Sequence, residues 1–154
     1  MTGGGAPAID ITTTIPRPPD EIWRAVATPK GVNAELGPYI HMTFPAGTRF
    51  DAVGEDELGK PLFGSWLLLF SVLPFDRHTF GLEGVGQGWF REASSSWMQR
   101  SWRHERWIEP CEGGCTVRDR VSVEPRITAV KPMTSAFVRL IFEHRHRRLK
   151  ALYG

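Results

Sequence analysis

The sequence predicts an α+β fold in which a curved antiparallel sheet of seven strands wraps around one long C-terminal helix. Three observations support this prediction. Short runs rich in strand-forming residues follow one another between residues 48 and 124, separated by Gly, Pro and Asp. Two short helical patterns lie between the first strand and these runs, and no Gly or Pro follows Pro132 until Gly154. Strands and helices therefore do not alternate along the chain, as they would in a parallel α/β fold.

The chain of 154 residues is about the size of one domain, and we expect a single domain over residues 8–154. Residues 1–7 are rich in Gly and are expected to be flexible. From residue 8 to 15, Ile9, Ile11 and Ile15 alternate with polar residues, which predicts a half-buried strand. The start lacks the basic residues and apolar run of a signal peptide, which predicts a cytoplasmic protein.

Two short helices are predicted next. Prolines 16, 18 and 19 end the first strand, and the acidic pair at 20–21 suits the first turn of a helix. Its inner face would carry Ile22, Trp23 and Val26. A second helical piece over residues 30–36 is expected to stop at the Gly-Pro pair at 37–38.

Six further strands are predicted, over residues 48–53, 63–73, 77–83, 88–93, 98–109 and 115–124. The short connections between them favour an antiparallel meander. The run from 65 to 73 is apolar on both faces, which is unusual for a sheet with one face in water. A homodimer that covers its outer face is one explanation.

The last two strands allow a register to be predicted. A two-residue turn centred on Gly113 and Gly114 places Arg103 opposite Glu124, a complementary pair on the solvent face. The other face then carries eight residues of mixed character: Trp102, His104, Arg106, Ile108, Val117, Asp119, Val121 and Val123. A slip by one residue would mix the two faces.

This inward face includes charged groups that need partners. In the predicted register Arg106 lies diagonal to Asp119, within reach of its long side chain. The pair could be a structural ion pair. Alternatively, these groups could orient a ligand, or His104 could transfer a proton.

The closing helix, over residues 129–153, is predicted to bury one stripe of side chains against the sheet. At helical spacing this stripe consists of Met133, Ala136, Phe137, Leu140, Ile141 and His144. The opposite face would carry Ser135, Arg139, Glu143, His146 and Lys150. Val138, Phe142 and Leu149 widen the apolar arc beyond the stripe, so most of the helix is expected to be covered. A long helix laid across a curved sheet leaves a cavity between the two unless large side chains fill it, and His144 would be either a core histidine or a polar group of that pocket.

Composition narrows the function further. Lys and Arg exceed Asp and Glu by 19 to 17, too small a bias to indicate nucleic-acid binding. The longest apolar run, residues 66–70, is too short to span a membrane. The two cysteines, Cys111 and Cys115, are expected to be reduced, and too few ligands lie near them for a metal site. We therefore expect no metal and no cofactor.

Several segments resemble the SRPBCC, or START-like, superfamily over nearly the whole chain. They are Ile15 to Trp23, the Trp102-Arg-His104-Glu-Arg106 strand, the Asp119-Arg-Val121 strand that leads to Glu124-Pro125, and Phe142 to Leu149. The resemblance implies the helix-grip fold of the birch-pollen allergen, polyketide cyclases and coenzyme-Q-binding proteins. It is greatest with an uncharacterised bacterial subgroup that has a similar Trp-x-His strand and a closing helix rich in His and Arg.

The leading functional hypothesis is the binding or transport of a hydrophobic small molecule, such as a lipid, an isoprenoid or a polyketide-like aromatic, between the sheet and the closing helix. The expected ligand-binding residues are Phe80, Leu82, Trp102, His104, Arg106, Asp119, Phe137, Leu140, Ile141 and His144. One alternative is a cyclase-, dehydratase- or hydrolase-like enzyme with His104 as general base and Asp119 or Arg106 as its partner. Another is an interaction module whose cavity is filled by its own Trp and Phe side chains.

Overall fold

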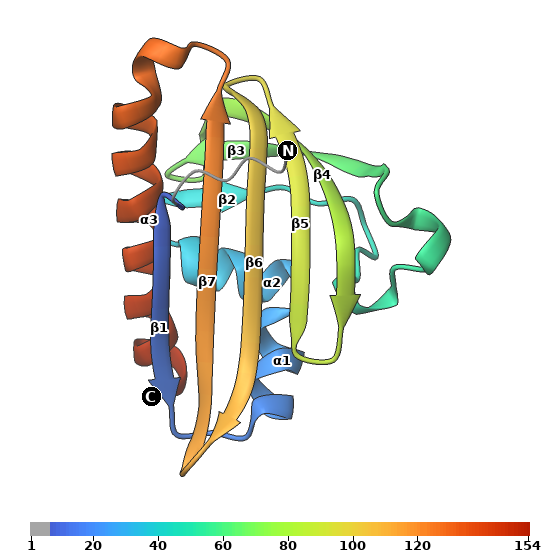
Figure 1. The fold of residues 1–154 in the computed structure, drawn as a ribbon, viewed down its shortest axis with the longest axis vertical. Coiled ribbons are helices and arrows are strands. Elements are labelled where there is room, and N and C mark those ends of the chain that lie inside the picture. Colours follow the sequence, from blue (N-terminus) through green and yellow to red (C-terminus); the bar gives the residue numbers. More distant parts are fainter. Residues whose placement is uncertain (1–6) are drawn as a thin grey trace.

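The computed structural model describes residues 7–154, and all seven strands form one antiparallel sheet (Figure 1). The strands are β1 (Ile9–Ile15), β2 (Ile40–Met42), β3 (Pro61–Leu69), β4 (Leu73–Gly86), β5 (Trp89–Ser96), β6 (Gln99–Cys111) and β7 (Gly114–Pro125). Their order across the sheet is β1-β7-β6-β5-β4-β3-β2. The sheet curls into a half-barrel beside a long C-terminal helix, which confirms the predicted fold class. The expected flexible start lies outside the described residues, apart from Pro7.

Two short helices connect β1 to β2, as predicted. Helix α1 (Pro19–Val26) begins with a proline and two acidic residues, and α2 (Pro29–Leu36) is capped by Thr28, whose Oγ1 accepts from the amide of Gly31 at 2.9 Å. The two helices cross so closely at Gly31 that a Cβ there would lie 2.2 Å from the carbonyl oxygen of Ala25. Only glycine fits at this crossing.

The position predicted for the second strand is wrong. Residues 50–52 form a 3₁₀ turn, η1 (Phe50–Ala52), and the strand next to β3 is the short β2 instead. The carboxamide of Asn33 holds β2 in place, since it donates to the carbonyl of Met42 and accepts from its amide. Phe50 is buried against the rings of Phe44 and Phe80 rather than in a strand. Three residues of strand are too few for an alternating pattern to be visible in the sequence.

The predicted register of the β6–β7 hairpin is wrong by two residues. The turn centres on Glu112 and Gly113, so that Cys111 pairs with Gly114. Gly113 adopts a φ of 81°, which favours glycine, whereas a Cβ on Gly114 would lie 2.0 Å from the Ile15 carbonyl oxygen. A shift of two residues preserves the faces, so the predicted inward face is retained. The residues that lie opposite each other on β6 and β7 differ from those predicted.

The new register brings the charged groups of the inward face together. Arg106 lies directly opposite Asp119 rather than diagonal to it. On the outer face, Arg103 bonds to Glu83 instead of Glu124. In the observed register Arg106 and Asp119 are therefore closer than predicted, and the predicted pair of Arg103 with Glu124 does not form.

The long helix α3 (Lys131–Tyr153) follows a 3₁₀ turn, η3 (Thr128–Val130), and packs against β1, β7 and α2. The predicted buried face is only partly right, because the helix is buried most deeply along the widened apolar arc rather than along the predicted stripe. The residues that α3 buries are Val138, Phe142, Arg145, His146 and Leu149. Met133 and Leu140 are 68% and 63% exposed, and His146, expected to face solvent, is buried. A stripe with two ionisable side chains can be buried only because other elements supply their partners.

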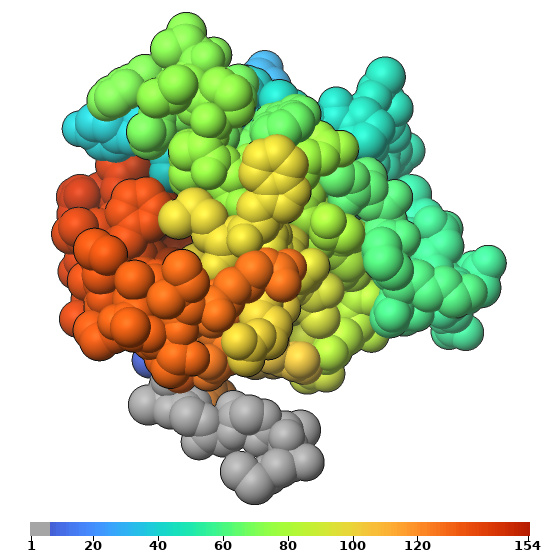
Figure 2. Space-filling view, turned by 90° about the horizontal axis from the view of Figure 1, so that it is seen from above, coloured from blue at the N-terminus to red at the C-terminus, as the bar shows by residue number. Residues whose placement is uncertain are grey.

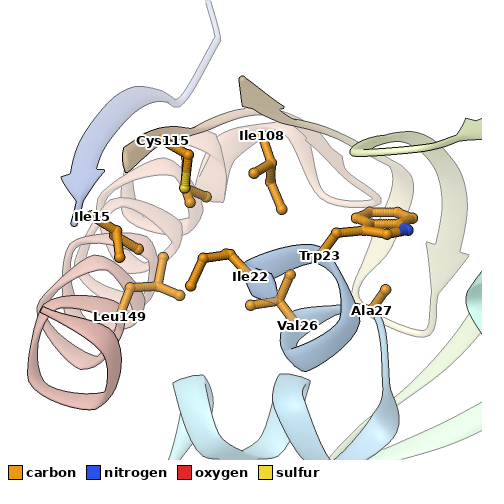
Figure 3. Packing of buried hydrophobic residues seen from close by; sticks show 9 residues of the cluster. Ile15, Ile22, Trp23, Val26, Ala27, Ile108, Cys115 and Leu149 are labelled. Carbon is orange, nitrogen blue, oxygen red and sulfur yellow. The ribbon is translucent and has the colours of Figure 1, made fainter. Parts of the chain in front are cut away.

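The lower end of the molecule, as drawn in Figure 1, is closed by a packed apolar cluster. Ile22, Trp23 and Val26 of α1 meet Leu149 of α3 there, as Figure 3 shows. The cluster also contains Ile15, Ala27, Ile108, Cys115 and Val117. The inner face predicted for the first helix is thus confirmed. Within residues 7–154, no helix is long and apolar enough to cross a membrane.

Candidate functional site: an apolar cavity above a buried ion network

A cavity of about 650 Å³ lies between the concave face of the sheet and α3. Its wall is mostly apolar and is built by α1, α2, β2 to β6 and α3. The large apolar side chains that line it are Leu36, Ile40, Met42, Phe50, Leu67, Phe75, Phe80, Leu82, Phe90, Trp102, Phe137 and Ile141. A volume of this size falls in the range of small-molecule sites.

Exposed apolar side chains surround the upper end of this cavity. Most of the large exposed hydrophobic residues lie on three neighbouring segments: the β3–β4 turn (Phe70, Val72, Leu73), the β5–β6 turn (Trp97, Met98), and the start of α3 with the segment before it (Ile127, Met133, Phe137, Leu140). Figure 2, which views the molecule from above, shows these green, yellow and orange segments on one face. Met98, Ile127, Met133 and Phe137 also line the cavity, so the cavity reaches this face.

A buried ion pair network forms part of the cavity floor. Arg106 is fully buried, and its guanidinium group bonds to two carboxylates at once. Its Nε and Nη2 donate to Asp119 at 2.7 Å each, and its Nη1 and Nη2 donate to Glu35 at 2.9 and 2.7 Å. Four of its five N–H donors are used within the protein. Arg145 of α3 adds a bond from its Nε to Glu35 at 3.1 Å.

Asp119 also joins two histidines to this network. Its Oδ1 contacts Nε2 of His104 and its Oδ2 contacts Nε2 of His146, both at 2.7 Å. Nδ1 of His146 lies 2.8 Å from Oγ1 of Thr13 on β1. The network therefore ties α3 and β1 to the central strands.

Glu92 on β5 is the centre of a second polar group. Its Oε2 contacts Nε2 of His78 at 2.7 Å and accepts from Oγ of Ser94 at 2.7 Å, while its Oε1 lies 3.7 Å from Nδ1 of His104. Ser94 in turn accepts from the amide of Gly81. His78, Glu92 and His104 all line the cavity, so this group forms a polar strip in an apolar wall.

The surroundings keep these carboxylates ionised. Burial alone would raise the pKa of Asp119, but Arg106 and His104 hold that pKa well below its ordinary value. Burial also opposes the ionisation of Glu35, whose pKa is nevertheless lowered by Arg106 and Arg145. For Glu92, burial is outweighed by the neighbouring His104 and His78, which lower its pKa to about 2. The two carboxylates bound to Arg106 raise the pKa of its guanidinium well above the ordinary value, although burial alone would lower it.

The structure brings most of the sequence-predicted ligand residues to the cavity. Seven line it: Phe80, Leu82, Trp102, His104, Arg106, Phe137 and Ile141. Asp119 lies behind them, bound to Arg106 and two histidines. Leu140 faces solvent, and His144 bonds through Nε2 to the carbonyl of Gly37 at 2.7 Å. Asp119, Leu140 and His144 therefore do not line the cavity.

Sequence reasoning missed five members of the polar groups: Glu35, His78, Glu92, Arg145 and His146. Two of them had a signal in the sequence. Glu35 shares a helical stripe with Val32 and Leu36, and Glu92 alternates in phase with Phe90. A charged residue on an apolar face indicates a buried partner, although the pattern does not say which one. Among residues 7–154, no group of three or more His, Cys, Asp or Glu side chains could hold a metal ion.

Comparisons with known proteins agree with this architecture. A family described as "Domain of unknown function (DUF8410)" matches residues 13–153. No curated protein matches the chain.

Several solved structures are similar to it. Protein CV1439 from Chromobacterium violaceum is 15% identical, with a TM-score of 0.71 over 94% of this chain and 95% of that one. A START superfamily protein from Mycobacterium smegmatis is 13% identical, with a TM-score of 0.68 over 94% and 95% of the two chains. Ara h 8.0201 is 12% identical, with a TM-score of 0.53 over 90% and 93%. At these identities the matches show the fold, which is the START-like helix-grip fold predicted from the sequence.

Proposed function

The chain belongs to the DUF8410 family, and we propose that it binds or carries a hydrophobic small molecule, such as a lipid, an isoprenoid or a polyketide-like aromatic, in the cavity between the sheet and α3. The observation that carries this proposal is the cavity itself, about 650 Å³ in volume with a mostly apolar wall. An empty apolar cavity of this size would leave its lining without contacts on one side, whereas a bound apolar ligand gains about 25 cal/mol for each Å² removed from water.

The upper end of the cavity supplies a route for such a ligand. Met98, Ile127 and Met133 are exposed and also line the cavity. Solvent-exposed apolar side chains of this kind often mark binding surfaces. A ligand with little solubility in water could thus remain in contact with apolar groups as it enters.

The buried network supports a binder more than an enzyme. The bonds of Arg106 to Glu35 and Asp119 use most of its N–H donors, so little capacity is left for an enolate. His104 has a carboxylate near each ring nitrogen. The enzyme with His104 as general base therefore stays the second hypothesis, and the cavity volume speaks against a module filled by its own side chains. One domain over residues 8–154 and a cytoplasmic location remain part of the proposal.

Two measurements test the binding function. Native mass spectrometry of freshly purified protein, compared with a solvent-extracted aliquot, should reveal a non-covalent mass that extracts into organic solvent. Titration with the uncharged fluorescent probe N-phenyl-1-naphthylamine should show saturable binding at one site.

A matched pair of variants locates that site. Thr134 lines the cavity on α3, whereas Thr128 is exposed in η3 and does not line it. Thr134→Trp should fill part of the cavity and weaken probe binding at least 10-fold, whereas Thr128→Trp should leave binding unchanged. Equal binding by both variants would contradict binding in this cavity.

A further inference from the structure

His78 contributes a polar atom to the cavity wall that the protein itself leaves without a partner. The residue lies on β4, paired with Ser96 of β5, and is only 6% exposed. Its Nε2 is engaged by Glu92 at 2.7 Å. Because an ionised carboxylate only accepts hydrogen bonds, Nε2 must carry a hydrogen, and in the neutral imidazole Nδ1 is then a hydrogen-bond acceptor.

Nδ1 of His78 is open to the cavity. It has no hydrogen-bond partner among residues 7–154. The sealed side-chain polar atoms without a partner in that range are Ser65 Oγ and Gln99 Oε1, and Nδ1 is not one of them. Since His78 lines the cavity, the remaining accessible edge of its ring faces that space.

Trp102 packs against the His78 ring and brings a second polar group to this part of the wall. The Trp102 ring stands perpendicular to the His78 ring, with centroids 5.9 Å apart, and it also lines the cavity. Its indole N–H, which can only donate, likewise has no hydrogen-bond partner among residues 7–154, and it is not one of the sealed unpaired atoms of that range. The His78 ring packs near Phe80 and the Trp102 ring near Phe142, so each ring has an aromatic neighbour.

We propose that His78 and Trp102 form a polar subsite inside the cavity, which binds the hydroxyl group of an otherwise apolar ligand, a phenol or an alcohol. The subsite rests on the proposed function, because it needs the cavity to hold a ligand. A hydroxyl is the smallest group that can donate to an imidazole nitrogen and accept from an indole N–H at once. An ether oxygen only accepts, and a hydrocarbon does neither, so both leave a polar atom of the subsite unpaired, which weakens binding.

The test uses two probes of the same ring system, 2-naphthol and 2-methoxynaphthalene, with affinities measured by equilibrium dialysis. Wild-type protein should bind 2-naphthol about 10-fold more tightly than the methyl ether, which corresponds to one buried hydrogen bond. His78→Phe should reduce this ratio to about 1, and Trp102→Phe should reduce it in part. His41→Phe is the matched control, since His41 lies on β2 and does not line the cavity, and it should keep the wild-type ratio.

A second measurement needs no variant and therefore does not depend on how His78→Phe folds. In ¹⁵N spectra of the histidine rings, 2-naphthol should shift the Nδ1 signal of His78, and 2-methoxynaphthalene should not. Tight binding of both probes with equal affinity, and no selective Nδ1 shift, would overturn the subsite while leaving the proposed function in place. Failure of both probes to bind wild-type protein would overturn the proposed function for aromatic ligands and the subsite with it.

Discussion

Arg106 is fully buried between two carboxylates, those of Glu35 and Asp119, and each of the three groups needs the others. Burying a single charge is costly, and a buried pair is stable only when its geometry and hydrogen bonding are nearly complete. Here the guanidinium group donates two hydrogen bonds to each carboxylate, so both pairs are bidentate. Removing one member therefore leaves uncompensated charge in the core.

Arg106→Met tests this dependence. We expect it to lower the free energy of unfolding by about 3–5 kcal/mol, because Glu35 and Asp119 would lose their main counter-ion. Urea denaturation monitored by circular dichroism measures the loss. Arg103→Met is the control on the same strand, where an exposed pair with Glu83 should contribute at most about 1 kcal/mol. Equal losses in the two variants would show that the buried network does not stabilise the fold.

The ionisation of Glu92 predicts a pH dependence of stability. Its pKa in the folded protein is about 2, below the ordinary value of 4.5. A carboxylate whose pKa is lower in the folded than in the unfolded state stabilises the folded protein while it is ionised. This stabilisation is complete above about pH 5 and is lost as the pH falls through the folded-state pKa. Glu92→Gln should thus lower the free energy of unfolding by about 3 kcal/mol at pH 7, and the difference from wild type should shrink between about pH 4.5 and 2. Denaturation at pH 7, 4 and 2.5 measures this trend, and a difference that stays constant with pH would contradict it.

At the scale of one element, α3 shows that apolar residues do not by themselves decide which face of a helix is buried. The helix buries Val138, Phe142 and Leu149 together with Arg145 and His146. Those two ionisable residues find Glu35 and Asp119 on other elements. Their partners make this face the inner one, whereas Met133 and Leu140 are left at the surface.

Two alanine substitutions distinguish the observed rotation of α3 from the one predicted by periodicity. Phe142 has no exposed surface and Leu140 is mostly exposed. Phe142→Ala should lower the free energy of unfolding by about 3–5 kcal/mol, because it leaves a cavity in the core. Leu140→Ala should change it by about 0.5 kcal/mol or less. Thermal and urea unfolding measure the two losses, and a larger loss of stability in Leu140→Ala than in Phe142→Ala would contradict the observed rotation.

At the scale of the whole molecule, the two ends differ in character. The lower end is closed by the packed cluster of α1, α3, β6 and β7 shown in Figure 3, and the upper end exposes apolar side chains around the cavity. The outer face of β3, which suggested a homodimer, is partly covered by the chain itself. The Trp66 and Trp97 rings pack edge to face with centroids 5.1 Å apart, and the guanidinium carbon of Arg77 lies 4.9 Å from the centroid of the Trp66 ring. The exposed turn residues remain as the surface that a partner could cover.

The homodimer predicted from the sequence stays a prediction, and the exposed turns define its test. We expect size-exclusion chromatography with light scattering to give the mass of two chains at micromolar concentration. Phe70→Ser, which removes an exposed apolar group on the β3–β4 turn, should shift the population toward single chains. A wild-type mass of one chain at every concentration would exclude the dimer.

Periodicity and turn residues in the sequence determined the fold class, the order of the helices and the inward face that holds His104, Arg106 and Asp119. These features depend on neighbours within a few residues along the chain, so local patterns carry them. Only the tertiary structure decided the place of β2, the register of the β6–β7 hairpin and the rotation of α3. It also decided the partners of the buried charges. Arg106 meets Glu35 across 71 positions, and Arg145 meets Glu35 across 110. A charged side chain can be buried only where its counter-ion arrives from another element, and no local pattern shows where that will be.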